Sequence, residues 1–127
     1  MEQKGKKILV IDDDDDFRLS TRKILESDGY DVVEAKSGKE GFDMAESISP
    51  DLVLIDIIME SYTEGFNLVQ RLNENEKTKD IPRIVLTTLG IQQDLDAISP
   101  KELDTKFILQ KPIKKEELLK MVGSLLA

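Results

Sequence analysis

Apolar and polar positions alternate with two different periods along this chain, and the pattern predicts a series of strands and helices. Short apolar runs predict strands at residues 7–11, 31–35, 51–55, 81–87 and 106–110. Apolar residues at helical spacing predict helices at residues 15–27, 37–47, 65–73 and 114–126. Strands that alternate with helices are typical of βαβ units, so we expect an α/β fold with a mostly parallel sheet.

The character of the strands indicates their places in the sheet. The strand at residues 51–55 is the most apolar, which favours a central position with both faces covered. The strand at residues 31–35 is short and partly polar, which is typical of an edge strand.

One stretch departs from the regular alternation. Residues 91–105 should supply a helix before the last strand, but Pro100 disfavours helical geometry at Ser99. We therefore expect a short helix near residues 94–98, followed by a turn.

The composition narrows the class of function. The chain has 127 residues, which predicts a single domain with its core at about residues 6–126. It contains no Cys and no His, so a disulfide framework, a thiolate nucleophile and a Cys/His zinc site are excluded. Any relay through a phosphohistidine would need that group on a partner protein.

Charge and hydropathy bear on partners and location. The formal net charge of -8 disfavours direct binding of nucleic acid, whose phosphates it repels. No apolar stretch approaches the roughly 20 residues of a membrane span. The first residues lead straight into a strand, so we expect no signal peptide and a cytoplasmic protein.

Polar side chains follow four of the apolar runs, at the points where the predicted strands end. Asp12 and Asp13 follow the first run, and Asp56, Thr87 and Lys111 follow the third, fourth and fifth. The carboxyl ends of parallel strands share one edge, which is where open α/β sheets form sites. Asp12 and Asp13 are expected at the end of a buried strand, where carboxylates need a cation such as Mg²⁺. The set predicts Mg²⁺-assisted phosphoryl transfer, with Asp56 as the candidate nucleophile and Lys111 as a cation that pairs with Asp56 and then with the phosphoryl oxygens.

Each of these residues also has an ordinary structural interpretation. Taken alone, Asp56 could cap a turn, Thr87 could be a plain β-branched strand residue, and Lys111 could lie on the surface at a strand end. The carboxylates of residues 14–16 are best explained as a solvated helix start, because Asp favours the N-cap and the first turn. The ordered set at successive strand ends is what makes the functional interpretation specific.

Two other acidic motifs do not fit the run of aspartates. An EF-hand loop beginning at Asp12 would need Gly at its sixth position and Glu at its twelfth, where this chain has Phe17 and Lys23. A phosphatase of the haloacid dehalogenase type would need Thr where Asp16 stands.

The chain resembles the receiver domain of bacterial two-component response regulators, similar to the chemotaxis response regulators. The resemblance extends over about residues 6–126. The segments that carry it are Ile8 to Asp13, Asp51 to Asp56, Ile84 to Thr88, and Lys111-Pro112. It implies a flavodoxin-like (βα)5 fold, a three-layer sandwich whose parallel sheet has the strand order 2-1-3-4-5.

The resemblance also implies a metal site. Asp13 and Asp56 would bind Mg²⁺ or Mn²⁺ directly, together with the backbone carbonyl of Ile58. Asp12 would help through water.

The same resemblance implies the chemistry and its partners. Asp56 would accept a phosphoryl group from a sensor histidine kinase or a histidine phosphotransfer protein, and Lys111 and Thr87 would hold the phosphoryl oxygens. The domain would catalyse its own phosphorylation and slow dephosphorylation. It would be mainly a signalling switch that controls a downstream protein or an output domain.

Four features depart from the family pattern. Glu60 stands where a Pro is usual, and the loop that contains it is one residue longer, so we expect residues 60–64 to be a more mobile loop. Ile108 replaces the usual switch aromatic. The nearest aromatic, Phe107, is one position early and is expected on the other side of the strand. The segment before Lys111 is longer and contains Pro100.

Two rival functions stay open from the sequence. One is a pseudo-receiver, folded alike but not phosphorylated, that acts as a protein-binding module. The other is a phosphatase or phosphotransferase acting on small metabolites. The oligomeric state is equally open, because some receivers form homodimers through the fourth helix, fifth strand and fifth helix.

Overall fold

The computed structural model describes residues 5–56, 62–87 and 107–126. Within these residues the chain forms a five-stranded parallel sheet with the order β2-β1-β3-β4-β5, which confirms the predicted flavodoxin-like fold. The strands are β1 (Lys7–Ile11), β2 (Asp31–Ala35), β3 (Leu52–Asp56), β4 (Arg83–Thr87) and β5 (Ile108–Gln110).

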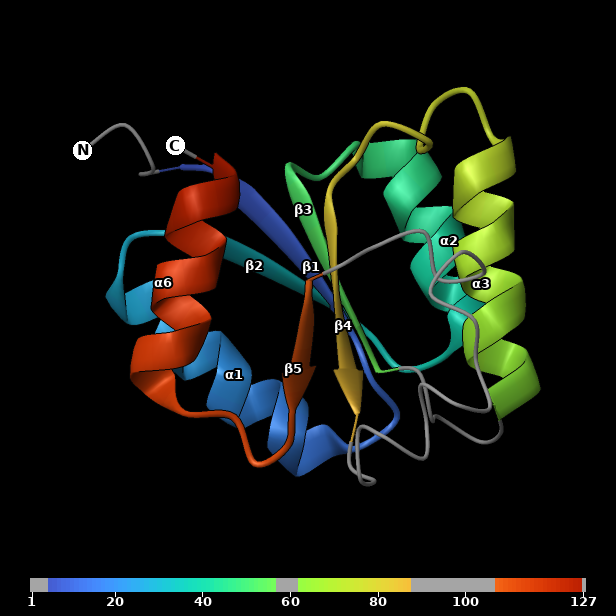
Figure 1. Cartoon of the computed structure of the whole chain (residues 1–127). Helices are drawn as coiled ribbons and strands as arrows, with labels where there is room; N and C mark the ends of the chain where they lie inside the picture. The colour runs from blue at the N-terminus through green and yellow to red at the C-terminus, as the bar shows by residue number, and fades with distance from the viewer. Residues whose placement is uncertain (1–4, 57–61, 88–106, 127) are drawn as a thin grey trace.

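Helices cover both faces of this sheet. They are α1 (Asp15–Ser27), α2 (Gly38–Ile48), α3 (Tyr62–Glu74) and α6 (Lys115–Leu126). Figure 1 shows α1 and α6 on one face of the sheet and α2 and α3 on the other. Among the described helices, none is both long and apolar enough to cross a membrane.

The sheet separates two apolar layers, because successive side chains of a strand point to opposite faces. In β1, Leu9 and Ile11 pack toward α2 and α3, whereas Ile8 and Val10 pack toward α1 and α6. All four are completely buried. Burial of one such side chain contributes about 1.5–3 kcal/mol, so the strands are held firmly from both sides. The predicted central position of β3 and the edge position of β2 are both confirmed.

Helix α3 and strand β4 begin at other residues than the sequence-based expectation. Helix α3 begins at Tyr62, so the predicted loop at residues 60–64 is helical from residue 62 onward. Strand β4 begins at Arg83 because Pro82 has no N–H for the ladder, and the N–H of Ile81 closes a turn onto the Thr78 carbonyl. The predicted short helix at residues 94–98 and the start of the 60–64 loop lie outside the described residues.

Helix α2 approaches β1 closely at Gly41. A Cβ atom at this position would lie 2.8 Å from Cγ1 of Ile11 and closer still to its Cδ1. Glycine therefore sets the distance between this helix and the sheet at a point where the backbone conformation itself is ordinary.

Gly41→Ala is expected to lower the free energy of unfolding by about 1–3 kcal/mol, because an added methyl overpacks this contact. The loss outweighs the gain of about 1 kcal/mol that Ala brings to a helix. Urea denaturation followed by circular dichroism measures it. Ile11→Val removes the nearest Cδ1 atom, so the double variant should recover part of the loss. Two strictly additive losses would show that the Gly41–Ile11 contact is not the cause.

Candidate functional site

The predicted site residues meet at the carboxyl edge of the sheet. Asp56 and Thr87 are the last residues of β3 and β4, while Asp12 and Lys111 directly follow β1 and β5. Strand register aligns these ends, since Asp56 pairs with Leu86 and Thr87 pairs with Gln110. Figure 1 shows the arrowheads of β4 and β5 pointing to the same edge.

Three carboxylates form a tight cluster at this edge. One oxygen from each of Asp12, Asp13 and Asp56 lies within 4.8 Å of the others. Asp12 and Asp56 are buried, at 0% and 3% exposure. Asp13 is exposed, which corrects the expectation that both neighbouring aspartates are buried, because β1 ends at Ile11 and Asp13 projects beyond the sheet. The third predicted oxygen ligand, the carbonyl of Ile58, lies outside the described residues.

Lys111 supplies positive charge beside these carboxylates. Its Nζ lies 2.6 Å from Oδ2 of Asp12 and 3.4 Å from Oδ2 of Asp56. The pairing expected with Asp56 is therefore present, but the shorter contact is to Asp12. The ring of Phe17 covers a further side of the ammonium, with its centroid 3.9 Å from Nζ. The Lys111 side chain is only 11% exposed.

Asp12 is fixed on every polar atom. Its Oδ1 accepts a hydrogen bond from the Asp14 N–H at 2.9 Å, and its Oδ2 accepts from Lys111. Its backbone N–H donates to the Ala35 carbonyl of β2 at 3.1 Å, and its own carbonyl accepts from the Arg18 guanidinium. The buried carboxylate of Asp12 is thus oriented by protein groups.

The donor set fits a divalent cation. Three carboxylates and one ammonium leave a formal charge of two negatives around a group of oxygen atoms. Mg²⁺ and Mn²⁺ favour oxygen ligands and keep several water ligands when bound. Asp13 is exposed, so water can reach a cation at this site.

Comparison with known sequences identifies the family. The sequence model described as the response regulator receiver domain matches residues 8–123. This chain belongs to the response regulator receiver domain family. The resemblance noted from the strand-end residues is thereby confirmed.

Individual relatives match this receiver domain along nearly its whole length. Protein PilH of Pseudomonas aeruginosa is 33% identical over 121 residues, which cover 95% of this chain and 98% of PilH. The DNA-binding dual master transcriptional regulator RpaA of Synechocystis is 38% identical over 120 residues, or 94% of this chain. The match spans 48% of RpaA, so this chain corresponds to about half of that regulator.

Solved structures agree with the sequence comparison. Chemotaxis protein CheY4 of Vibrio cholerae superposes with a TM-score of 0.83 at 26% identity, covering 95% of this chain and 98% of CheY4. A putative response regulator from Chloroflexus aurantiacus gives a TM-score of 0.84 at 30% identity, covering 97% and 98% of the two chains.

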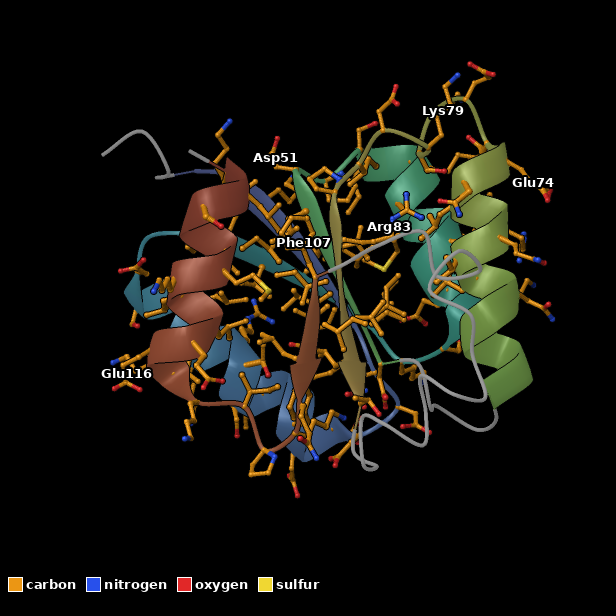
Figure 2. All side chains as sticks on the ribbon, viewed as in Figure 1. Asp51, Glu74, Lys79, Arg83, Phe107 and Glu116 are labelled. Carbon is orange, nitrogen blue, oxygen red and sulfur yellow. The ribbon has the colours of Figure 1, made fainter. Side chains whose placement is uncertain are left out.

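The switch region of this receiver domain departs from the family pattern as the sequence predicted. Ile108 packs with the cluster beneath α2 and α3, whereas Phe107 packs with the cluster beneath α1 and α6. The two side chains therefore lie on opposite faces of the sheet. Figure 2 places Phe107 at the amino end of β5, away from the edge that carries the carboxylates.

Sequence reasoning missed one polar residue of this receiver domain, Arg18 of α1, which is 8% exposed. The apolar pattern of this helix does not mark Arg18, because the residue is charged. A signal was present, since Arg18 lies three residues before Thr21 and seven before Leu25, on the buried stripe of the helix. A cation on a buried stripe requires acidic partners.

The partners of Arg18 come from the helix and from β2. Its guanidinium bonds to Asp15 and, at 3.1 Å, to Oε1 of Glu34. Burial opposes its charge, but these hydrogen bonds outweigh burial and raise the pKa of Arg18. Arg22 binds Oε2 of Glu34 at 2.8 Å and Glu26 at 3.0 Å, and these hydrogen bonds raise the pKa of Arg22.

Proposed function

We propose that this receiver domain accepts a phosphoryl group on Asp56 from a phosphohistidine of a partner protein, in a reaction that depends on Mg²⁺. The observation that carries the proposal is the cluster of three carboxylates with Lys111 against two of them. Asp56 is the proposed nucleophile because it ends the central strand β3 and its carboxylate lies beside both Asp13 and the Lys111 ammonium.

Asp13 and Asp56 would hold the divalent cation, Mg²⁺ or Mn²⁺, with the carbonyl of Ile58. When bound, the cation supplies charge neutralisation for the incoming phosphoryl oxygens. Asp12 acts indirectly, through water, because its two carboxylate oxygens already accept from the Asp14 N–H and from Lys111.

The transfer itself needs in-line positioning more than acid–base chemistry. An oxygen of Asp56 attacks phosphorus, the new P–O bond forms as the P–N bond of the phosphohistidine breaks, and the electron pair returns to the imidazole of the donor. Lys111 and the Thr87 hydroxyl would hold the phosphoryl oxygens. New negative charge on Asp56 then draws Lys111 away from Asp12, which begins the switch.

The phosphohistidine belongs to a sensor histidine kinase or a histidine phosphotransfer protein, because this chain has no His. The phosphorylated domain would control a downstream protein or an output domain through protein contacts in the cytoplasm. Relatives such as RpaA, a DNA-binding dual master transcriptional regulator, support an output of this kind. The net charge of -8 favours protein contact over direct DNA contact by this domain.

A second candidate function is a pseudo-receiver, a binding module of the same fold that is not phosphorylated. The position of Ile108, in place of the usual aromatic, favours it, because the nearest aromatic, Phe107, packs in the opposite layer.

Intact mass after incubation with acetyl phosphate separates the two functions. We expect a gain of about 80 Da with Mg²⁺ present, the mass of one phosphoryl group, and none with a chelator. A chain that binds Mg²⁺ but gains no mass would contradict phosphorylation and favour the binding module.

A further inference from the structure

Arg18 joins three parts of the fold beside the carboxylates. One end of its guanidinium bonds to Asp15 in the first turn of α1, and its Nε donates to Glu34 of β2. Its Nη1 donates to the backbone carbonyl of Asp12, at 2.5 Å. The two carboxylate bonds hold the guanidinium in place, so the third bond holds the carbonyl.

The carbonyl of Asp12 belongs to the peptide that leads to Asp13. Because a peptide unit is planar, fixing this carbonyl also fixes the N–H and the Cα of Asp13, which lie in the same plane. The other side of Asp12 is already fixed, since its N–H donates to Ala35. Asp13 itself is exposed, so packing does little to orient it.

We propose that Arg18 is a positioning residue for the divalent cation, which it serves by setting the direction of Asp13 through the Asp12–Asp13 peptide. The inference rests on the proposed function, because it assigns Asp13 as a ligand. It goes further by naming a residue outside the carboxylate cluster that determines how tightly the cation binds. Groups that orient metal ligands typically change metal affinity by about 10–100-fold when they are removed.

Arg22 provides a matched comparison. It lies one turn further along α1 and binds the same Glu34, but among the described residues its other ion pair is with Glu26, away from the site. Its side chain is 41% exposed, against 10% for Arg18. If Mg²⁺ affinity depended only on anchoring α1 to β2, loss of either arginine would weaken it. If it depends on the Asp12–Asp13 peptide, only loss of Arg18 would weaken it.

The test compares Arg18→Lys with Arg22→Lys, which both conserve charge. Lysine lacks the planar fork that lets arginine bond several acceptors at once. Titration with MgCl₂, followed through the backbone amide NMR signals of residues 12 and 13, gives the dissociation constant of the folded protein. We expect Arg18→Lys to weaken Mg²⁺ binding by about tenfold or more. We expect Arg22→Lys to stay within about twofold of the parent. The ion pairs of Arg22 are with Glu34 and Glu26 and do not include the Asp12 carbonyl.

A spectroscopic signature separates positioning from simple loss of stability. The carbonyl carbon shift of Asp12 should move in Arg18→Lys, which loses the charged hydrogen bond, and stay in place in Arg22→Lys. If Arg18→Lys does not fold, Arg18→Met replaces it. Removing a positive charge would by itself tighten cation binding. Weaker Mg²⁺ binding in Arg18→Met would therefore have to come from loss of positioning.

The outcomes are distinguishable. Equal Mg²⁺ affinity of the parent and the Arg18 variants would overturn the role of Arg18 and leave the proposed function intact. Equal weakening in the Arg18 and Arg22 variants would also overturn it, in favour of general anchoring of the helix. A parent chain that binds no Mg²⁺ would overturn both the role of Arg18 and the proposed function.

Discussion

Asp56→Asn is expected to abolish phosphoryl labelling of this receiver domain while leaving it folded. The amide keeps the shape of the side chain at the end of β3 but is not a nucleophile. Asp56 is 3% exposed and shares its site with two other carboxylates, so loss of its charge also relieves repulsion. Intact mass after acetyl phosphate and Mg²⁺ measures the labelling, and urea denaturation measures the stability.

Asp16→Asn is the matched control for this experiment. It removes the same charge by the same change of side chain, but Asp16 is exposed on the first turn of α1. We expect it to be labelled like the parent. Labelling of Asp56→Asn to the same extent as the parent would contradict the assignment, and the acceptor would then be sought first at Asp12 and Asp13.

Lys111→Met is expected to lower the free energy of unfolding by about 3–5 kcal/mol in buffer without divalent cations. The ammonium lies 2.6 Å from a carboxylate that is completely buried, and its removal leaves that charge without its ion-pair partner. The methionine side chain has a similar length, so the loss reports charge more than packing. Urea denaturation in the presence of a chelator measures it.

Mg²⁺ should restore more stability to Lys111→Met than it adds to the parent. The ammonium repels a divalent cation, so its loss tightens cation binding, and a ligand that binds only the folded state stabilises it by mass action.

Lys79→Met removes a lysine from the exposed pair with Glu76, and we expect it to cost no more than about 1 kcal/mol with no response to Mg²⁺. A loss of similar size in both lysine variants would show that the buried Lys111–Asp12 pair contributes no more stability than the exposed Lys79–Glu76 pair.

The sequence was sufficient for the sheet and for which side chains meet at its edge. Apolar runs fixed the strands, and the rule that parallel strands share a carboxyl edge brought Asp12, Asp56 and Lys111 together across 99 and 55 residues of separation. Central β3 and edge β2 also followed from the distribution of apolar residues.

What the sequence could not supply is the exposure of single residues and the contacts between side chains of different elements. Asp13 was expected to be buried like Asp12, but β1 ends at Ile11 as predicted and Asp13, the second residue after it, is exposed. Arg18 was missed because its acidic partner Glu34 comes from a different element, and a single helix pattern does not show which strand lies beneath it. The expected contact of Lys111 with Asp56 is present, but its shorter contact with Asp12 is evident only from three-dimensional distances.

The position of β5 has a consequence for how the domain opens. This strand has three residues and, among the described strands, pairs with β4 alone. It is followed at once by Lys111, whose N–H donates to the Thr87 carbonyl at 2.7 Å. Central strands exchange their amide hydrogens only when most of the protein unfolds, whereas a short edge strand exchanges through local opening. Each local opening of β5 therefore also withdraws the ammonium from Asp12, so the charge balance of the site fluctuates while the rest of the sheet stays closed.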